Sequence, residues 1–174
     1  MSLVVVGVGD CQVSTDSQAT LVTYALGSCI ALLAHDSVSK VGGLLHYMLP
    51  ESSLDATRAQ RHPAVFGDTG VQLLLDTMMR KGADKRRLVL RAAGGAQMMD
   101  DQGVFNIGKR NQLALKKLLW KSGLMLHGEE TGGMLARTVR MEIASGKAFL
   151  RPGGGQENEW ALPGRPAGIS GGVR

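Results

Sequence analysis

Two short apolar runs joined by a polar turn constrain the fold of this chain more than any other feature. The first run extends from Ile30 to Ala34, the second from Val41 to Leu45, and the segment between them reads HDSVSK. Runs of this length bounded by turn residues are typical of buried strands, and so short a connection favours an antiparallel pair. The pattern therefore predicts a buried hairpin in which the start of the first strand lies beside the end of the second.

This hairpin would bring a cysteine close to a histidine. Cys29 follows a Leu-Gly-Ser turn and opens the first run, while His46 closes the second run shortly before Pro50. A thiol beside an imidazole is the minimal unit of cysteine nucleophilic catalysis, because the thiolate is the reactive form and an imidazolium lowers the pKa of the thiol. Taken singly, each residue is better explained as a buried structural thiol or a core histidine, so the residues alone leave both interpretations open.

The rest of the chain alternates between strand and helix patterns. Strands are expected at residues 3–8, 11–14, 21–24, 86–93, 124–127, 135–143 and 147–150, with 11–14 as the hairpin return of 3–8. One helix is expected to begin at Pro63 and to bury Val71, Leu74, Leu75 and Met78, and a second to span 107–121. These elements predict an α/β fold: a single layered domain whose mixed or largely antiparallel sheet is covered by two main helices.

Length and composition narrow the domain organisation and the partners. With 174 residues and no internal repeat, we expect one domain over residues 1–150, followed by a disordered Gly/Pro-rich tail over 151–174. Two cysteines without metal spacing, and the lack of a signal peptide or membrane span, predict a cytoplasmic protein. The formal charge of +5 is spread along the chain without a dense basic run, which argues against nucleic-acid binding.

Motifs over most of the chain resemble the CheD family, the chemoreceptor glutamine deamidases of bacterial and archaeal chemotaxis. The matching runs are LVTYALGSC (21–29), IALLAHD (30–36), GGLLHYMLPE (42–51), RAAGGAQMM (91–99), NIGKRN (106–111) and ETGGMLARTVRMEIASGKAFL (130–150). LGSC alone is a weak pattern. Together with a histidine 17 positions later and the downstream IGxRN and TGGxxxR elements in order, it is specific.

The resemblance implies a Cys-His-Thr triad, which at the matching positions consists of Cys29, His46 and Thr23. It implies hydrolysis of glutamine side-chain amides on methyl-accepting chemotaxis receptors to glutamate, without a metal or an organic cofactor. Cys29 would attack the carboxamide, His46 would hold the thiolate as an ion pair and protonate the departing ammonia, and Thr23 would orient the imidazole. One departure lies within the motif, where Tyr24-Ala25 stands in place of a small or glycine-like residue.

Secondary contacts follow from the same motifs. The backbone N–H groups around Ser28 and Cys29 are the nearest donors for a tetrahedral oxyanion, and Gly27 leaves room beside them. The glycine-rich loop with Gly94, Gly95, Met98 and Met99 is expected to contact a substrate or partner, although the methionines fit a core role equally well. This loop departs from the family pattern, which has a basic residue followed by Met-Phe in place of Gln-Met-Met.

Two alternatives remain beside the deamidase interpretation. The chain could be a regulatory binding module of the chemotaxis system that docks on receptors or on the phosphatase CheC, as the resemblance also implies. It could also be a cysteine amidohydrolase with another protein target. An intact triad favours an enzyme, since a binding module gains nothing evident from a paired thiol and imidazole. Neither nucleic-acid binding nor direct membrane insertion is expected.

Overall fold

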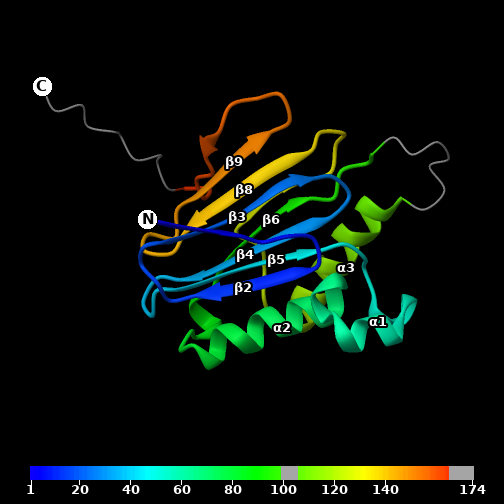
Figure 1. Cartoon of the computed structure of the whole chain (residues 1–174), viewed down its shortest axis with the longest axis horizontal. Helices are drawn as coiled ribbons and strands as arrows, with labels where there is room; N and C mark the ends of the chain where they lie inside the picture. Colours follow the sequence, from blue (N-terminus) through cyan, green and yellow to red (C-terminus); the bar gives the residue numbers. More distant parts are fainter. Residues whose placement is uncertain (99–105, 165–174) are drawn as a thin grey trace, which may run out of the picture.

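The structure, a computed structural model, describes residues 1–98 and 106–164, and its strands form two five-stranded sheets (Figure 1). The first sheet has the order β1 (Ser2–Val5), β3 (Ala19–Leu26), β8 (Arg137–Glu142), β9 (Ala148–Pro152) and β10 (Asn158–Glu159). The second has the order β2 (Asp10–Ser14), β5 (Val41–Tyr47), β4 (Ile30–Asp36), β6 (Val89–Gly94) and β7 (Gly128–Thr131). The β1–β3 and β6–β7 pairs are parallel and the others antiparallel, so the expected mixed strand directions are divided between two sheets.

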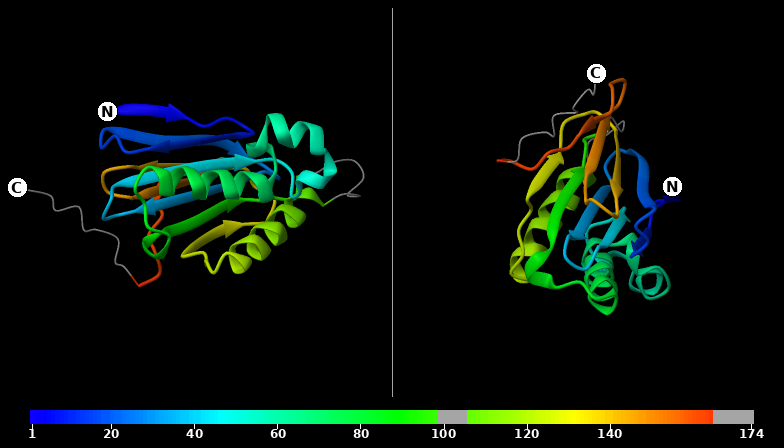
Figure 2. Two further views of the ribbon diagram at one scale, coloured as in Figure 1. Left: turned by 90° about the horizontal axis from the view of Figure 1, so that it is seen from below. Right: turned by 90° about the vertical axis from the view of Figure 1, so that its left-hand side faces the viewer.

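Helices cover one face of the second sheet (Figure 2). The α-helices are α1 (Ala56–Arg61), α2 (Gly67–Arg80) and α3 (Ile107–Lys121), and the short 3-10 turns are η1 (Ser52–Leu54), η2 (Pro63–Val65) and η3 (Lys85–Arg87). The molecule thus has three layers: the helices, the second sheet with β4 at its centre, and the first sheet with β8 at its centre. The predicted class, a layered α/β domain with two main helices, is confirmed.

Strand β4 is central because it is buried on both faces. Its residues Ile30, Leu32 and Ala34 pack toward α2 and α3, while Ala31 and Leu33 pack toward the first sheet. Successive side chains of a strand point to opposite faces, so a strand that is apolar throughout separates two cores. The continuous apolar run in the sequence therefore reflects a strand covered by helices on one side and by a second sheet on the other.

The two long helices follow the predicted apolar faces. Helix α2 buries Val71, Leu74, Leu75 and Met78, as expected from their spacing. Its start differs from the prediction, because Pro63 opens the separate turn η2 and α2 begins at Gly67. Phe66 between them has an extended backbone and a fully buried side chain, which interrupts the helical path. Helix α3 has the bounds that the sequence predicted.

One predicted strand pairing and one predicted strand are wrong. Segment 11–14 is a strand, but β2 pairs with β5 in the second sheet, whereas β1 pairs with β3 in the first. The Gly9 N–H donates to the His46 carbonyl at 2.8 Å, which turns the chain from one sheet to the other. Segment 124–127 is not a strand. The strand begins at Gly128, whose missing side chain leaves room for Trp160 and Arg91.

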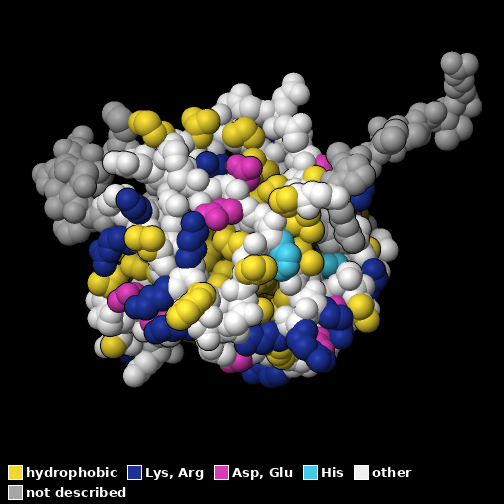
Figure 3. All heavy atoms as spheres, turned by 180° about the vertical axis from the view of Figure 1, so that it is seen from behind, with side chains coloured by type: hydrophobic (Ala, Val, Ile, Leu, Met, Phe, Trp, Pro, Cys, Tyr) yellow, Lys and Arg dark blue, Asp and Glu magenta, His cyan; other side chains and the backbone are white. Residues whose placement is uncertain are grey.

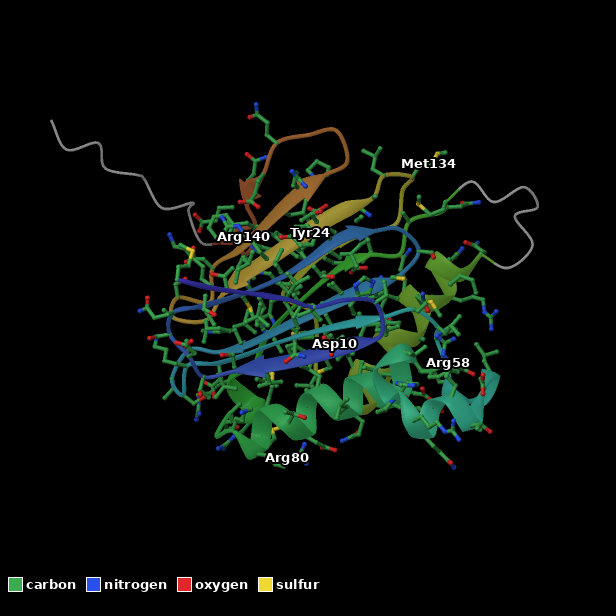
Figure 4. The ribbon with its side chains drawn as sticks, viewed as in Figure 1. Asp10, Tyr24, Arg58, Arg80, Met134 and Arg140 are labelled. Carbon is green, nitrogen blue, oxygen red and sulfur yellow. The ribbon has the colours of Figure 1, made fainter. Side chains whose placement is uncertain are left out.

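The expected disordered tail is corrected for its described part, residues 151–164. The segment completes β9, forms β10 and buries Trp160 between the sheets. Arg140 on β8 (Figure 4) stacks over the ring of Phe149 at 3.7 Å and binds Glu157 at 2.7 Å, which holds the segment against the sheet. A single tryptophan and a few cross-strand contacts therefore order a stretch whose composition suggested none. Residues 165–174 lie outside the described residues.

The surface agrees with the even spread of charge along the sequence. On the face seen in Figure 3, Lys and Arg side chains are distributed around the surface and hydrophobic groups lie between them. No helix among the described residues is long and apolar enough to cross a membrane.

Candidate active site

The predicted hairpin is present and places Cys29 near His46. In the β4–β5 ladder, Ile30 pairs with Tyr47 and Ala31 with His46. Cys29 lies directly before β4, and it packs in the layer between the two sheets together with Ala31. Cys29 is therefore on the same face as His46 and diagonal to it across the two strands, a position from which side chains reach each other.

The His46 ring is oriented by a threonine from the opposite sheet. The Thr23 hydroxyl donates to the Val6 carbonyl at 2.6 Å, and the same oxygen lies 2.8 Å from Nδ1 of His46. A threonine hydroxyl has a single proton, so Oγ1 accepts the hydrogen bond from Nδ1–H. His46 is thereby held as the tautomer whose Nε2 carries the lone pair.

The other ring nitrogen of His46 makes no hydrogen bond to a described residue. Its Nε2 is buried and has no hydrogen-bond partner among the described residues. Burial lowers the pKa of His46 to about 4, so the imidazole is neutral at neutral pH. A neutral, oriented imidazole with one free lone pair is in the state required to accept a proton.

The Cys29 thiol is half-buried and favours its neutral form. Burial raises the pKa of Cys29, and the backbone N–H of the same residue lowers it in part. Since burial also lowers the pKa of His46, both groups prefer to be uncharged. This differs from the expected thiolate–imidazolium ion pair: the resting groups favour a neutral thiol beside a neutral imidazole, and they are not hydrogen-bonded to each other.

The backbone of residues 27–29, called the Cys29 turn here, is fixed through its carbonyl groups. The Gly27 carbonyl accepts from the Ala96 N–H at 2.9 Å, and the Cys29 carbonyl from the Gly95 N–H at 2.8 Å. The Ser28 carbonyl accepts from the side-chain amide of Asn111 at 2.9 Å. Among the described residues, the Ser28 N–H donates to no acceptor, and the Cys29 N–H faces only the sulfur of its own residue. The turn therefore has anchored carbonyls and two N–H groups that no other described residue uses.

Gly94 and Gly95, for which a substrate or partner contact was expected, are both buried and support the Cys29 turn. Their contact with a partner stays a prediction. A Cβ atom on Gly94 would overlap the Cys29 carbonyl oxygen, and both glycines have positive φ, 106° and 60°. Only glycine adopts such a backbone this close to another chain segment without strain. The turn that carries the cysteine thus requires glycine at both positions.

Met98 lies at the edge of the site. Its side chain is 46% exposed and covers Gly27, at 3.1 Å from where a Cβ of that glycine would lie. A pocket of about 170 Å³ next to the turn is lined by Ser28, Ala96, Gln97, Met98, Asn106, Ile107 and Gly108. The partner-contact role expected for Met98 stays a prediction. Met99 lies outside the described residues.

A β-bulge separates Thr23 from the Cys29 turn. In β3 the register against β8 shifts between Thr23 and Leu26, and Ala25 has a positive φ of 52°. An extra residue in one strand bends it and redirects its side chains. The Tyr24-Ala25 departure noted in the motif falls at this bulge, where Ala25 takes a left-handed backbone.

The sequence analysis named neither Asn111 nor Arg137 as site residues, although both lie in the quoted motifs NIGKRN and TGGxxxR. The fully buried Asn111 contacts the Cys29 turn. Arg137 donates to the carbonyls of Gly132 at 2.8 Å and Gly94 at 3.3 Å, which ties the loop that contains Gly132 to the end of β6. Their positions in the two motifs could have marked them as candidates. That both donate to backbone carbonyls is visible only in the fold.

The second cysteine and the metal-binding residue types offer no competing site. Cys11 packs on the helix side of the second sheet, and burial followed by the charge of Asp10 raises its pKa to about 12. Among the described residues, no three His, Cys, Asp or Glu side chains gather as metal ligands. Of the two thiols, only Cys29 therefore lies on the same face of the sheet as His46.

Comparison with known proteins identifies the relatives of this chain. Residues 48–152 match the family model CheD, described as CheD chemotactic sensory transduction. A protein of Solibacter usitatus named "Probable chemoreceptor glutamine deamidase CheD" is 51% identical, with 90% of this chain and 93% of the relative covered. A Syntrophus aciditrophicus relative, "Probable chemoreceptor glutamine deamidase CheD 1", is 46% identical over 91% and 99%.

A relative with lower identity carries the same name. The Pyrococcus horikoshii protein named "Probable chemoreceptor glutamine deamidase CheD" is 41% identical, with 87% of this chain and 93% of the relative covered. The family model begins after His46, so the three positions of the triad lie outside that match. The identity and the coverage nevertheless extend over most of the chain. This chain belongs to the CheD family.

Proposed function

We propose that this protein is a chemoreceptor glutamine deamidase in which Cys29 is the nucleophile, His46 the acid–base group and Thr23 the residue that orients it. The observation that carries the proposal is the state of His46: a buried neutral imidazole with Nδ1 hydrogen-bonded to Thr23 and Nε2 unpaired, diagonal to a thiol. The names of the relatives supply the reaction and the class of substrate.

The first half of the reaction forms a thioester. As Sγ of Cys29 attacks the glutamine carboxamide carbon, Nε2 of His46 accepts the thiol proton and the carbonyl electrons move to oxygen. The N–H groups of Ser28 and Cys29 are the donors for this oxyanion. When the carbonyl re-forms, the C–N bond breaks, His46 returns the proton to nitrogen, and ammonia leaves.

The second half hydrolyses the thioester. His46, neutral again, takes a proton from water as the oxygen attacks the same carbon. Collapse breaks the C–S bond, the proton passes from His46 to the cysteine sulfur, and glutamate is released. The lowered pKa of His46 suits both halves, because each begins with an imidazole that must be free to accept a proton.

A protein substrate has to present its glutamine at the Cys29 turn. The thiol is half-buried, Met98 covers the neighbouring Gly27, and Tyr24 of the same motif is exposed. We include Met98 in the proposed substrate contact, since a flexible thioether adapts to a helix surface. Docking on CheC is a further part of the proposal, as is a cytoplasmic location, where thiols are kept reduced.

The test is mass spectrometry of a receptor cytoplasmic fragment after incubation with the protein. Cys29→Ala and His46→Ala should leave every glutamine intact, while the unmodified chain converts specific glutamines to glutamate. Cys11→Ala is the matched control, because it removes the other half-buried thiol and should retain activity. Deamidation by Cys29→Ala would exclude this nucleophile. Co-purification of the fragment or of CheC without any loss of amide would favour the binding-module alternative.

A further inference from the structure

Beyond Ile30 and Tyr47, the two strands of the central hairpin separate. The ladder between β4 and β5 ends at this pair, and the chain continues into the Cys29 turn on one side and toward Met48 on the other. Backbone hydrogen bonds between the two strands therefore stop one residue short of Cys29. The spacing between Cys29 and His46 depends on what holds this open end together.

Asn111 of α3 bridges this open end. Its side-chain amide nitrogen donates to the Ser28 carbonyl at 2.9 Å and to the Met48 carbonyl at 2.9 Å. Ser28 directly precedes Cys29, and Met48 follows His46 by two residues. One fully buried NH2 group thus joins the two backbone segments that carry the thiol and the imidazole.

The helix that carries Asn111 is itself attached at this point. The Tyr47 hydroxyl donates to the backbone carbonyl of Asn111 at 2.6 Å, and Tyr47 is the neighbour of His46. The first turn of α3 also packs against the glycine loop, where Gly108 is so close to the carbonyls of Gly95 and Ala96 that a side chain would not fit. The amide is therefore presented from a fixed position.

The chemistry of the bridge selects asparagine. Two carbonyl oxygens require two donors from one short, uncharged group, and the asparagine NH2 supplies both. An aspartate would place an acceptor against two acceptors in a buried site. A serine has one proton and satisfies at most one carbonyl. The Oδ1 atom of Asn111 is buried without a partner in the described chain, so the residue retains an unsatisfied oxygen while it makes the bridge.

We propose that Asn111 is a positioning residue for the deamidation reaction, which bridges the carbonyls of Ser28 and Met48 and so sets the spacing of Cys29 and His46. The inference rests on the proposed function, since the spacing matters only if the two side chains react together. Asn111 does not touch the substrate. It acts through the backbone on either side of the site, where its side-chain amide replaces the missing hydrogen bonds between the two strands.

The test compares Asn111→Ala and Asn111→Ser with Leu119→Val. Leu119 is buried on the same helix two turns away, so Leu119→Val loosens the packing of α3 without touching the bridge. We expect the Asn111 variants to lower kcat by about 10–100-fold with little change in KM, as loss of an orienting contact does. Leu119→Val should retain kcat. Unfolding is measured alongside, and kinetics are taken where each variant is folded.

A second readout separates this proposal from the deamidase assignment. Alkylation of Cys29 by iodoacetamide, followed by mass spectrometry across pH, reports how readily the thiol loses its proton and needs no receptor. His46→Gln should slow alkylation at neutral pH, and Asn111→Ser should slow it in the same direction, with Cys11 as the internal reference. If Asn111→Ala and Asn111→Ser match Leu119→Val in kcat and in alkylation, the positioning role is excluded. If neither the unmodified protein nor any variant converts glutamine, the proposed function fails, and the alkylation rates alone test whether Asn111 positions Cys29 and His46.

Discussion

Two histidines of the central hairpin, His35 and His46, are both buried and both reach across to the first sheet, yet they differ in what their rings leave open. Nε2 of His35 donates to the Ile143 carbonyl at 2.8 Å, and its Nδ1 lies against Gly146. His46 uses Nδ1 toward Thr23, and its Nε2 has no partner in the described chain. Burial alone therefore does not mark a functional histidine, whereas an unpaired buried nitrogen beside a thiol does.

The same burial affects both rings electrostatically. It lowers the pKa of His35 and that of His46, the latter to about 4. One ring connects the sheets at the β8–β9 hairpin, and the other lies at the opposite end of the strands, next to the Cys29 turn. Substitutions at the two positions should thus separate a structural role from a catalytic one.

The largest expected difference is in activity. His46→Gln should lower the deamidation rate by about 10³-fold or more, because the group that accepts the thiol proton is lost. His35→Gln should retain kcat and instead lower the free energy of unfolding. Deamidation kinetics on a receptor fragment and chemical denaturation of both variants measure the two effects. Equal loss of activity in both would contradict the comparison.

The second difference concerns stability in mild acid. Folded His46 has a pKa of about 4, and the unfolded chain should titrate near 6.5, so the unfolded state binds more protons between these values. Stability is then fully present above pH 6.5 and falls by about 3 kcal/mol as the pH drops to 4. Urea denaturation across this range should show a smaller loss for His46→Gln.

His35 gives a second test of this acid dependence, because its ring is also buried. His35→Gln should remove part of the loss, since its pKa is lowered for the same reason. An acid profile unchanged in both His46→Gln and His35→Gln would show that neither ring is held neutral by the fold.

The third difference concerns the hydroxyl that orients His46. Thr23→Val should lower kcat by about 10–100-fold, since the ring loses its orienting acceptor while the shape of the side chain is kept. Thr23→Ser restores the hydroxyl and should recover most of the rate. Steady-state kinetics of the two variants decide this. A valine variant as active as the serine variant would remove Thr23 from the mechanism.

The smallest effect is expected at the His35 end. In Gly146→Ala, the new methyl group would overlap the His35 ring, and the backbone there has a φ of 70°. We expect the free energy of unfolding to fall by about 2 kcal/mol with no change in kcat. Thermal denaturation with parallel kinetics tests it. A loss of activity without a loss of stability would contradict the structural assignment of this end.

Strands and helices with strong periodicity were predictable from the sequence. The hairpin from Ile30 to Tyr47 and helix α3 follow directly from their apolar patterns. Partner choice was not predictable, because the pattern of β2 is satisfied equally by β1 or by β5, and only the turn at Gly9 sends it to the second sheet. The burial of Trp160 depends on packing against residues that are far away in the sequence, among them Gly128.

The proximity of Cys29 and His46 follows from the hairpin register alone, while their state does not. That the resting pair favours the neutral form depends on burial by a second sheet that the sequence did not predict. The Ser28–Asn111–Met48 bridge joins three distant segments through two backbone carbonyls. Every residue has such a carbonyl, so the sequence does not show which ones accept a side-chain hydrogen bond. Local periodicity thus predicts elements, whereas contacts to the backbone emerge only from the assembled fold.

Because Thr23 is uncharged, it does not repel a substrate that becomes more acidic as the reaction proceeds. A carboxylate in place of Thr23 would put a negative charge near a receptor segment that gains a glutamate with each proposed deamidation. The proton of Thr23 is instead donated to a backbone carbonyl, so His46 is oriented by a group with no charge and no titration near neutral pH. In the proposed reaction, glutamates left by earlier rounds would approach the site without repulsion from the residue that orients its base.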